Sequence, residues 1–223
     1  MRHYCKRRTG EKRCGMKVII PINGKNERIG RLFKTPKHLL LYRGIPAIKY
    51  NLEFFNCIPG IDRVYILTNL HYIAELYDFS DLAKIINVGE TPSQVATLRE
   101  FTTSLSDEAV MFIDCDIILN ELTVPDRNTV FVFENKNKDK QYSNYKVDEE
   151  REIVLGCNEK QEYEKYAGAG VYYFKSAQVF NKYSVGCSSI SEVISKMIAQ
   201  GETFFVNINS DIFRFGTLKD ILS

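Results

Sequence analysis

The chain has 223 residues, of which 44% are hydrophobic and 26% are charged. These are values of globular proteins, and they exclude a disordered, collagen-like or coiled-coil chain. The longest apolar runs, such as 18–22 and 110–113, are much shorter than the ~20 residues of a membrane span, so we expect no span.

The net charge of +2 conceals an asymmetry between the N-terminus and the rest of the chain. Residues 1–14 carry six basic side chains and one acidic one, which leaves 24 basic and 27 acidic groups for the remainder. We predict that residues 1–15 form a basic, disordered extension and that 16–223 form the folded domain. A folded body with a net charge of −3 does not favour nucleic acid as a specific partner. The oligomeric state is left open.

Six cysteines and three histidines are scattered along the chain without a C-x-x-C motif or the spacing of a zinc site. The cysteines are therefore expected to be reduced and mostly buried, which is typical of a cytoplasmic protein. No apolar segment follows the basic N-terminus as it would in a secretory signal. We expect a cytoplasmic location.

The first half of the chain alternates between strands and helices. Short β-branched apolar runs predict strands, and apolar residues at a spacing of three or four predict helices. The predicted strands are 17–21, 63–68, 84–88 and 110–114, and the predicted helices are 47–56, 70–77 and 94–105. This alternation is typical of a parallel or mostly parallel sheet with helices on both faces.

The second half is richer in strands. Strands are predicted at 129–133, 145–147, 152–155, 171–174 and 204–208, and helices at 176–183 and 191–199. Ser189 or Ser191 is expected to cap the last helix, and Gly201 stands where a helix end favours glycine. Because no linker or repeat separates the halves, we predict one α/β domain, a three-layer sandwich around a mostly parallel mixed sheet.

The polar loop after the first predicted strand, residues 23–36, is the first candidate site. In an open α/β sheet, ligands bind beyond the carboxyl ends of the strands, where this loop lies. Gly24 allows close backbone approach to a phosphate, and Arg28 and Lys37 supply positive charge for triphosphate oxygens. A surface turn with solvated charges is an equally good interpretation of these residues alone.

Two carboxylates, Asp114 and Asp116, lie at the end of the predicted buried strand 110–114. Carboxylates at the end of an apolar strand are unfavourable unless they meet a cation. Oxygen ligands without a nearby histidine suit Mg²⁺, with Mn²⁺ as the alternative. In the other interpretation, Asp116 caps the following segment and Asp114 makes a structural hydrogen bond.

Taken in chain order, these segments resemble the nucleotidyltransferases that join an NTP to a sugar 1-phosphate. The resemblance extends from Lys17 to Leu222 and implies the fold of the nucleotide-diphosphosugar transferases. It rests on V-I-I-P-I-N-G-K-N-E-R at 18–28, P-K-H-L-L at 36–40, T-P-S-Q-V-A-T-L at 91–98, Asp116, Y-K-V-D at 145–148 with E-K at 159–160 and A-G-A-G-V-Y-Y-F at 167–174, and F-G-T-L-K-D at 215–220.

The resemblance implies roles for individual residues. Arg28 and Lys37 are the catalytic cations, on the β- and γ-phosphates and on the α-phosphate respectively. Mg²⁺ is bound by Asp116, with Asp114 as the second candidate. The residues assigned to the nucleotide are Asn23, Gly24, Lys25, Thr91 and Gln94, and those assigned to the sugar phosphate are Glu159, Lys160 and Gly170. The product is an activated sugar for capsule or other surface-polysaccharide synthesis.

Two departures from the family pattern keep other functions open. Asn26 replaces the usual second glycine, and Arg214 stands where the family has a second metal-binding aspartate, with Asp211 as a candidate substitute. The first alternative function is a GT-A-type glycosyltransferase, because 114–116 is a literal D-x-D motif that binds a nucleotide sugar through Mn²⁺. The second is a catalytically silent nucleotide-binding relative, which the arginine favours.

Overall fold

The computed structural model describes residues 15–24, 35–160, 162–209 and 212–215. The predicted extension 1–15, apart from Gly15, lies outside these residues. So do the site candidates Lys25, Arg28 and Asp211, and the closing segment beyond Phe215.

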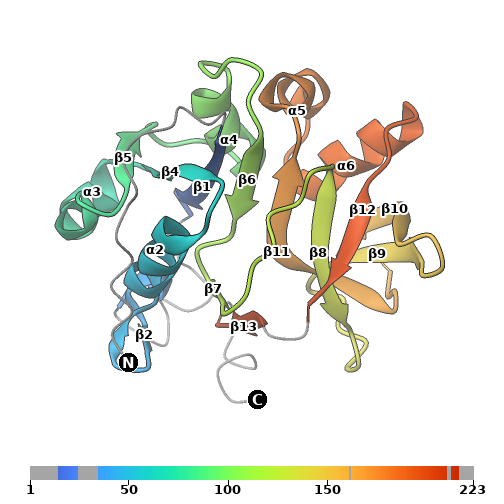
Figure 1. Cartoon of the computed structure of the whole chain (residues 1–223), viewed down its shortest axis with the longest axis horizontal. Coiled ribbons are helices and arrows are strands. Elements are labelled where there is room, and N and C mark those ends of the chain that lie inside the picture. Colours follow the sequence, from blue (N-terminus) through green and yellow to red (C-terminus); the bar gives the residue numbers. More distant parts are fainter. Residues whose placement is uncertain (1–14, 25–34, 161, 210–211, 216–223) are drawn as a thin grey trace.

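A nine-stranded mixed sheet runs through the molecule in the order β5-β4-β1-β6-β11-β8-β12-β10-β9. Its strands are β1 (Met16–Ile22), β4 (Ile61–Thr68), β5 (Lys84–Asn87), β6 (Val110–Ile113), β8 (Thr129–Glu134), β9 (Ser143–Asp148), β10 (Ile153–Glu159), β11 (Tyr166–Phe174) and β12 (Phe205–Ile208). The first four pair in parallel. Strand β11 joins the halves by pairing antiparallel with β6 and β8, so the halves lie side by side in Figure 1.

Helices cover both faces of the sheet. The helices are α2 (Ala47–Cys57), α3 (Leu70–Leu76), α4 (Gln94–Thr102), α5 (Ala177–Ser184) and α6 (Ile190–Ala199). Side chains of α2 and α3 share a buried cluster with Val18 and Ile20, whereas α4, α5 and α6 share one with Ile19. Because successive strand side chains point to opposite faces, these clusters lie on the two sides of the sheet. The predicted three-layer α/β fold with a mixed sheet is confirmed.

Polar side chains fix where several helices begin. The side chains of Asn69, Ser93 and Ser176 accept a hydrogen bond from the first turn of α3, α4 and α5, which satisfies an otherwise free backbone donor. Helix α6 begins with a full capping box between Ser189 and Glu192. Of the two predicted caps, Ser189 is therefore the one used. Gly201 follows the helix with φ +87°.

The structure differs from the sequence-based expectation mainly in short strands and in strand lengths. Four pairing segments were not predicted: β2 (Leu41–Tyr42), β3 (Ile45–Pro46), β7 (Ile117–Leu119) and β13 (Ile212–Arg214). They have two or three residues each, too few to show a periodicity. Strand β10 continues to Glu159 and β11 begins at Tyr166, so both reach further toward the centre of the molecule than predicted.

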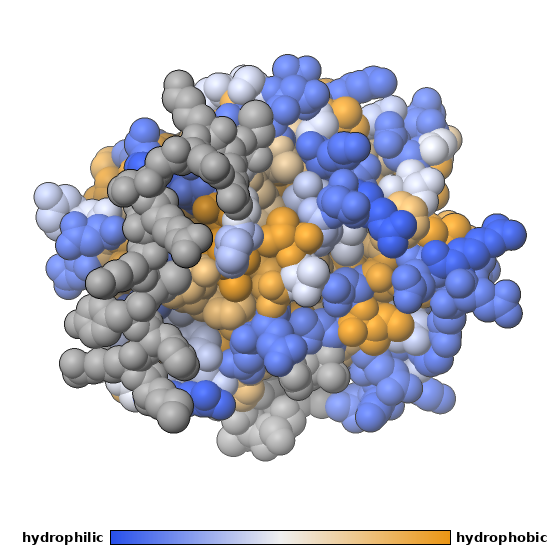
Figure 2. All heavy atoms as spheres, in the orientation of Figure 1, coloured by the Kyte–Doolittle hydropathy of each residue, from blue (hydrophilic) through white to orange (hydrophobic). Residues whose placement is uncertain are grey.

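The described part of the chain contains no helix that is both long and apolar enough to cross a bilayer. In the face shown in Figure 2, hydrophilic residues surround a smaller area of hydrophobic residues. Most large apolar side chains instead lie in the two clusters that sandwich the sheet.

Candidate active site

A cleft of about 820 Å³ lies along the edge of the sheet where the parallel strands end. Parallel strands bring their carboxyl ends to the same edge, and here β1, β4 and β6 are followed by Asn23, Asn69 and Asp114, which all line the cleft. The cleft continues to residues of β9, β10 and β11 in the second half of the sheet. We call these two parts the nucleotide half and the acceptor half, after the ligands that the sequence assigns to their residues.

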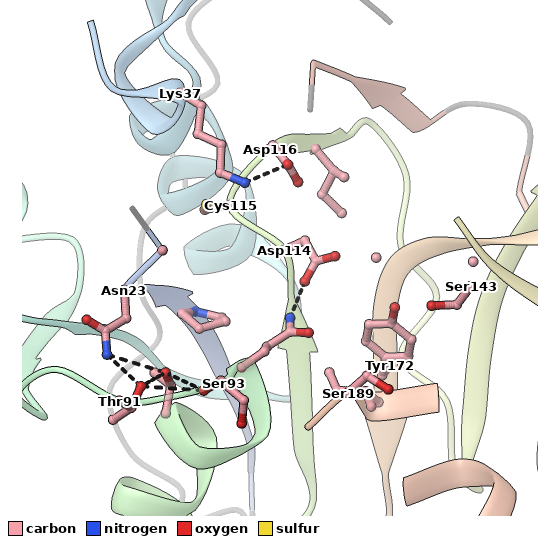
Figure 3. A pocket seen from close by; sticks show the side chains of 18 of the residues that line it. Asn23, Lys37, Thr91, Ser93, Asp114, Cys115, Asp116, Ser143, Tyr172 and Ser189 are labelled. Atoms are coloured by element: carbon pink, nitrogen blue, oxygen red, sulfur yellow. Dashed lines mark hydrogen bonds and ion pairs between the residues drawn. The ribbon is translucent and has the colours of Figure 1, made fainter. Parts of the chain in front are cut away.

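Asn23 is the centre of a hydrogen-bond network in the nucleotide half (Figure 3). Its Nδ2 donates to the carbonyl oxygen of Gly89 at 2.9 Å and to Oγ1 of Thr91 at 2.8 Å. Its Oδ1 accepts a hydrogen bond from Asn69. The predicted nucleotide-binding residues Asn23 and Thr91 thus meet in the cleft, and their polar atoms hold the ends of three strands together.

Gly24 also lines the cleft, and its carbonyl oxygen accepts a hydrogen bond of 3.0 Å from the Tyr72 hydroxyl. A Cβ built on Gly24 would have no heavy atom of the described residues within 4 Å. The backbone is therefore open here, as close approach of a phosphate requires.

Gln94, the first residue of α4, reaches across the cleft to a carboxylate. Its Nε2 donates to Oδ1 of Asp114 at 2.5 Å. The sequence assigns Gln94 to the nucleotide, and the structure adds this carboxylate partner, which lies 20 residues further along the chain.

Lys37 and Asp116 form an ion pair between the two halves of the cleft. Lys37 opens the short 3₁₀ helix η1 (Lys37–Leu39), and its Nζ lies 2.7 Å from Oδ2 of Asp116. Burial alone would lower the pKa of Lys37, but the charge of Asp116, the hydrogen bond to it and the charges of Cys115 and Asp114 together raise this pKa. Lys37 is therefore a fixed positive charge, and Figure 3 shows it opposite Asp114 and Asp116.

Asp114 is packed against the backbone of β11. Its amide N–H donates to the carbonyl oxygen of Gly170 at 2.8 Å, and Gly170 has φ +81°. A Cβ on Gly170 would lie 2.8 Å from Oδ2 of Asp114. The predicted substrate-binding residue Gly170 thus makes room for a carboxylate, which is reason enough for a glycine.

The surroundings of the two aspartates fit a hard divalent cation. Burial, and next the charge of Asp116, raise the pKa of Asp114 to about 7, so Lys37 only partly offsets the excess negative charge. Among the described residues, no group of three or more His, Cys, Asp or Glu side chains could hold a metal. Two carboxylate ligands with substrate phosphates and water completing the shell is the usual arrangement for Mg²⁺.

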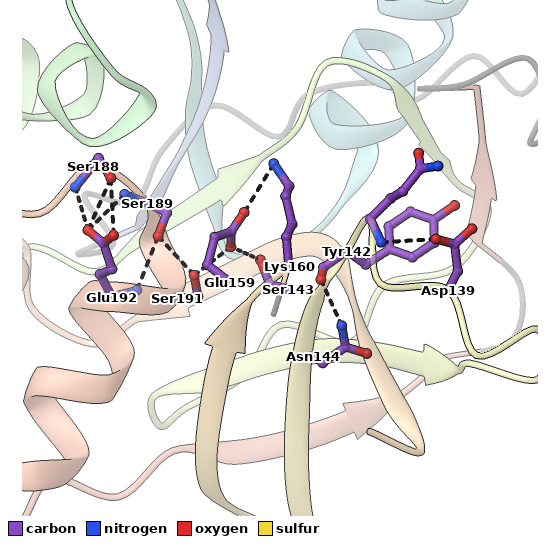
Figure 4. Close-up of polar contacts among 11 residues, drawn as sticks. Asp139, Tyr142, Ser143, Asn144, Glu159, Lys160, Ser188, Ser189, Ser191 and Glu192 are labelled. Carbon is purple, nitrogen blue, oxygen red and sulfur yellow. Dashed lines mark hydrogen bonds and ion pairs between the residues drawn. The ribbon is translucent and has the colours of Figure 1, made fainter. Parts of the chain in front are cut away.

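In the acceptor half, Glu159 is held at the end of β10 by two serines from other segments (Figure 4). Its Oε2 accepts hydrogen bonds from Ser143 and, at 2.7 Å, from Ser191. Burial would raise the pKa of Glu159, but the hydrogen bonds from Ser143 and Ser191 and the charge of Lys160 lower it. Glu159 is therefore an ionised, positioned acceptor.

Lys160 lies beside Glu159, with 3.2 Å between its Nζ and Oε1 of the glutamate, and its side chain is 48% exposed. Both residues were predicted from the sequence as part of the acceptor site, and both line the cleft. Sequence reasoning missed Tyr142, Ser143 and Ser189, which line it as well. They carry no motif of their own and reach the site only through the pairing of β9 with β10 and the start of α6.

Arg214 lines the acceptor half too, at the end of β13. Its Cζ lies 3.4 Å from the ring centroid of Phe133 and 4.6 Å from that of Tyr142. The sequence marked this residue only as a departure from a family motif.

No protein-family model and no curated protein sequence matches the chain, but solved structures do. A CTP:phosphocholine cytidylyltransferase from Streptococcus pneumoniae matches with a TM-score of 0.76 at 16% identity, over 93% of this chain and 96% of that one. A putative glucose-1-phosphate thymidylyltransferase from Bacillus anthracis gives 0.75 at 17% identity, over 93% of both chains. This chain has the nucleotidyltransferase fold.

A third structure extends the comparison. A nucleoside-diphosphate-sugar pyrophosphorylase from Vibrio cholerae matches with a TM-score of 0.71 at 15% identity, over 92% of this chain and 98% of that one. The nucleotidyltransferase fold is thus present over nearly its whole length. Within it, this chain places its two aspartates and Lys37 where the two halves of the cleft meet.

Proposed function

We propose that the chain transfers a nucleotidyl group from an NTP to a phosphomonoester, such as a sugar 1-phosphate, and releases pyrophosphate. The observation that carries this proposal is the Lys37–Asp116 pair at the junction of the two halves of the cleft. The fold shared with nucleotidyltransferases supports it. A cleft of about 820 Å³ has the size of pockets that enclose small-molecule ligands.

The reaction needs positioning and charge neutralisation more than acid–base chemistry. An oxygen of the acceptor phosphate attacks the α-phosphorus of the NTP, and the bond between the α-phosphorus and its bridging oxygen breaks. Pyrophosphate leaves with that electron pair, and no proton has to move. Lys37 stabilises the charge that develops on the α-phosphate oxygens. Arg28 and Lys25, outside the described residues, are proposed contacts of the triphosphate.

Asp116, together with Asp114, is proposed to hold Mg²⁺, with Mn²⁺ as an alternative. The ion supplies charge neutralisation and a template for the phosphates. The Asp114 side chain is kept in place by the hydrogen bond from Gln94, and Asp116 by its ion pair with Lys37.

The remaining assignments follow the shape of the cleft. Thr91 and Gln94, in the nucleotide half, are proposed to contact the base and ribose. Glu159 is proposed to accept hydrogen bonds from acceptor hydroxyls, since its carboxylate is ionised and held by Ser143 and Ser191. Supply of an activated sugar for surface-glycan synthesis is the proposed purpose.

A pyrophosphate-release screen tests this function. The four NTPs are each incubated with Mg²⁺ and a panel of phosphomonoesters that includes sugar 1-phosphates, and the Lys37→Ala variant is run beside the wild type. Release that requires both an NTP and one acceptor, and that the variant lacks, is the expected result. Sugar transfer from a nucleotide sugar without any pyrophosphate release would show a glycosyltransferase instead.

A further inference from the structure

Arg214 lies close to Asp116 along the paired strands β7 and β13. Strand β13 pairs antiparallel with β7, with Arg214 opposite Ile117, and the N–H of Phe215 donates to the carbonyl oxygen of Asp116 at 3.0 Å. The backbone of Arg214 is therefore fixed one residue from a proposed metal ligand. Its side chain lines the acceptor half of the cleft.

Two aromatic rings hold the guanidinium of Arg214 in place. The rings of Phe133 and Tyr142 meet edge to face at 89°, with 5.3 Å between centroids. The Cζ of Arg214 lies over both, 3.4 Å from the Phe133 centroid and 4.6 Å from the Tyr142 centroid. Stacking of this kind fixes an arginine without using its N–H donors.

One nitrogen of this guanidinium has no partner in the described part of the chain. Its Nη1 is buried and makes no hydrogen bond to any described residue. A buried polar group without a partner is unfavourable, and more so when it is charged. A ligand that accepts hydrogen bonds from this guanidinium would remove that cost.

The other cations of the cleft already have carboxylate partners. Lys37 pairs with Asp116 at 2.7 Å, and Lys160 pairs with Glu159 at 3.2 Å. Among the described residues, no salt bridge joins Arg214 to a carboxylate. Within the described residues, the acceptor half therefore contains one positive charge without a carboxylate partner, next to the point where transfer would occur.

We propose that Arg214 binds the phosphate of the acceptor, through two N–H groups on its non-attacking oxygens. This rests on the proposed function. A guanidinium presents parallel donors that match two phosphate oxygens. The position beside Asp116 suits the group that must reach the α-phosphate. Because Arg214 covers the faces of Phe133 and Tyr142, these rings do not offer a cage for a quaternary ammonium, so the acceptor is anchored here by its anion.

Binding of inorganic phosphate to the full-length protein, followed by calorimetry, tests the inference. Arg214→Gln removes the charge and the parallel N–H donors of the guanidinium. We expect it to weaken phosphate binding at least about tenfold, the loss typical of a hydrogen bond to a charged group. Arg214→Lys retains the charge and should lose less. The affinity for NTP, measured separately, should change by less than about twofold, since Arg214 lies outside the nucleotide half.

Arg127→Gln is a matched control. The guanidinium of Arg127 also stacks on a phenylalanine, 3.6 Å from the ring centroid of Phe205, but Arg127 does not line the cleft. This variant should bind phosphate like the wild type. Unchanged phosphate affinity in Arg214→Gln, or an equal loss in Arg127→Gln, would overturn the inference.

The wild-type protein gives a second measurement that needs no folded variant. Phenylglyoxal modifies arginine, and peptide mapping follows each site. Phosphate should slow modification of Arg214 and leave that of Arg127 unchanged. A rate at Arg214 that phosphate does not alter contradicts the inference.

The inference and the proposed function fail in different ways. Phosphate binding that depends on Arg214, in a protein that releases no pyrophosphate, would support the anion site and exclude the proposed reaction. Pyrophosphate release by Arg214→Gln with an unchanged KM for the acceptor would exclude the anion site and support the proposed reaction.

Discussion

The two halves of the cleft are built in different ways. In the nucleotide half, side chains that follow successive parallel strands bind one another, as Asn23 does with Asn69 and Thr91. In the acceptor half, the strands are antiparallel and the lining residues come from segments spread between Gln141 and Arg214. Residues that follow successive parallel strands meet at one edge of the sheet in sequence order. In the acceptor half, the lining residues are instead scattered along the sequence.

The halves also differ in how their charges are neutralised. Asp114 and Asp116 leave an excess of negative charge at the junction, offset only in part by Lys37, and burial raises the pKa of Asp114 to about 7. The acceptor half contains the paired Glu159 and Lys160 and, in addition, Arg214, which forms no ion pair with any described carboxylate. The first arrangement favours a cation and the second an anion, which is the order needed to bring a metal-bound triphosphate to a phosphate.

The largest expected effect comes from removing the cation at the junction. Lys37→Ala should lower kcat by about 10²-fold or more, because a preorganised charged donor acts mainly on the transition state. Binding of NTP should weaken much less. Lys49→Ala, at an exposed lysine of α2 paired with Glu53, is the control. Near-normal turnover in Lys37→Ala would exclude its assigned role.

Removing one carboxylate at a time separates the two aspartates. Asp116→Asn should reduce Mg²⁺-dependent activity by about tenfold or more while folding survives, because the shape is retained and a charged ligand is lost. Asp114→Asn should reduce it less. Steady-state rates over a Mg²⁺ titration measure both effects. Unchanged Mg²⁺-dependent activity in Asp116→Asn would show that the metal does not bind at the junction.

The contact between the two halves can be tested at Gly170. Gly170→Ala forces an alanine to φ +81° and places its Cβ 2.8 Å from Oδ2 of Asp114, so we expect a loss of about 2–4 kcal/mol in unfolding free energy. Gly186→Ala has a similar φ of +75° but nothing within 4 Å of the added Cβ, and should lose about 1–2 kcal/mol. Urea denaturation compares the two. Equal losses would show that the packing against Asp114 is loose.

The smallest expected effect concerns the proton on Asp114. Its pKa is 3.8 without perturbation and about 7 in the folded protein, so the folded state binds the proton more tightly. The stability from this proton is complete below about pH 4 and is lost as the pH rises to about 7. Without divalent metal, Asp114→Asn should therefore melt at least about 2 °C higher than the wild type at pH 8. At pH 4 the two proteins should melt at about the same temperature.

An exposed aspartate is the control for that comparison. Asp78→Asn should change the melting temperature by the same amount at both pH values. A difference between Asp114→Asn and the wild type that does not grow with pH would mean that Asp114 is ionised throughout.

Much of the fold could be predicted because strong local patterns decide it. The apolar run of β1 and the spacing of Ile48, Leu52 and Phe55 in α2 predict buried elements of the right type. Strand β11 was predicted too short, because Gly168 and Gly170 reduce strand propensity. They are needed for close approach, since a Cβ on Gly168 would lie 2.9 Å from the Tyr145 ring.

The site could be predicted from the sequence only in part, for a related reason. Lys37, Asp114, Asp116 and the Glu159–Lys160 pair belong to short contiguous motifs, and the structure brings them into one cleft. The partners that set their properties are distant in sequence: Gln94 is 20 residues from Asp114, and Ser191 is 32 from Glu159. The position of the Arg214 guanidinium likewise depends on Phe133 and Tyr142. No local sequence pattern connects these two residues to Arg214.

An acceptor phosphate labelled with ¹⁸O tests the central claim most directly. If the acceptor attacks the α-phosphorus of the NTP, the whole label stays in the nucleoside diphosphate conjugate, and the pyrophosphate is unlabelled. Mass spectrometry of both products gives the answer. Release of a nucleoside monophosphate or a nucleoside diphosphate in place of pyrophosphate would contradict the account, because the acceptor would then have attacked the β- or the γ-phosphorus.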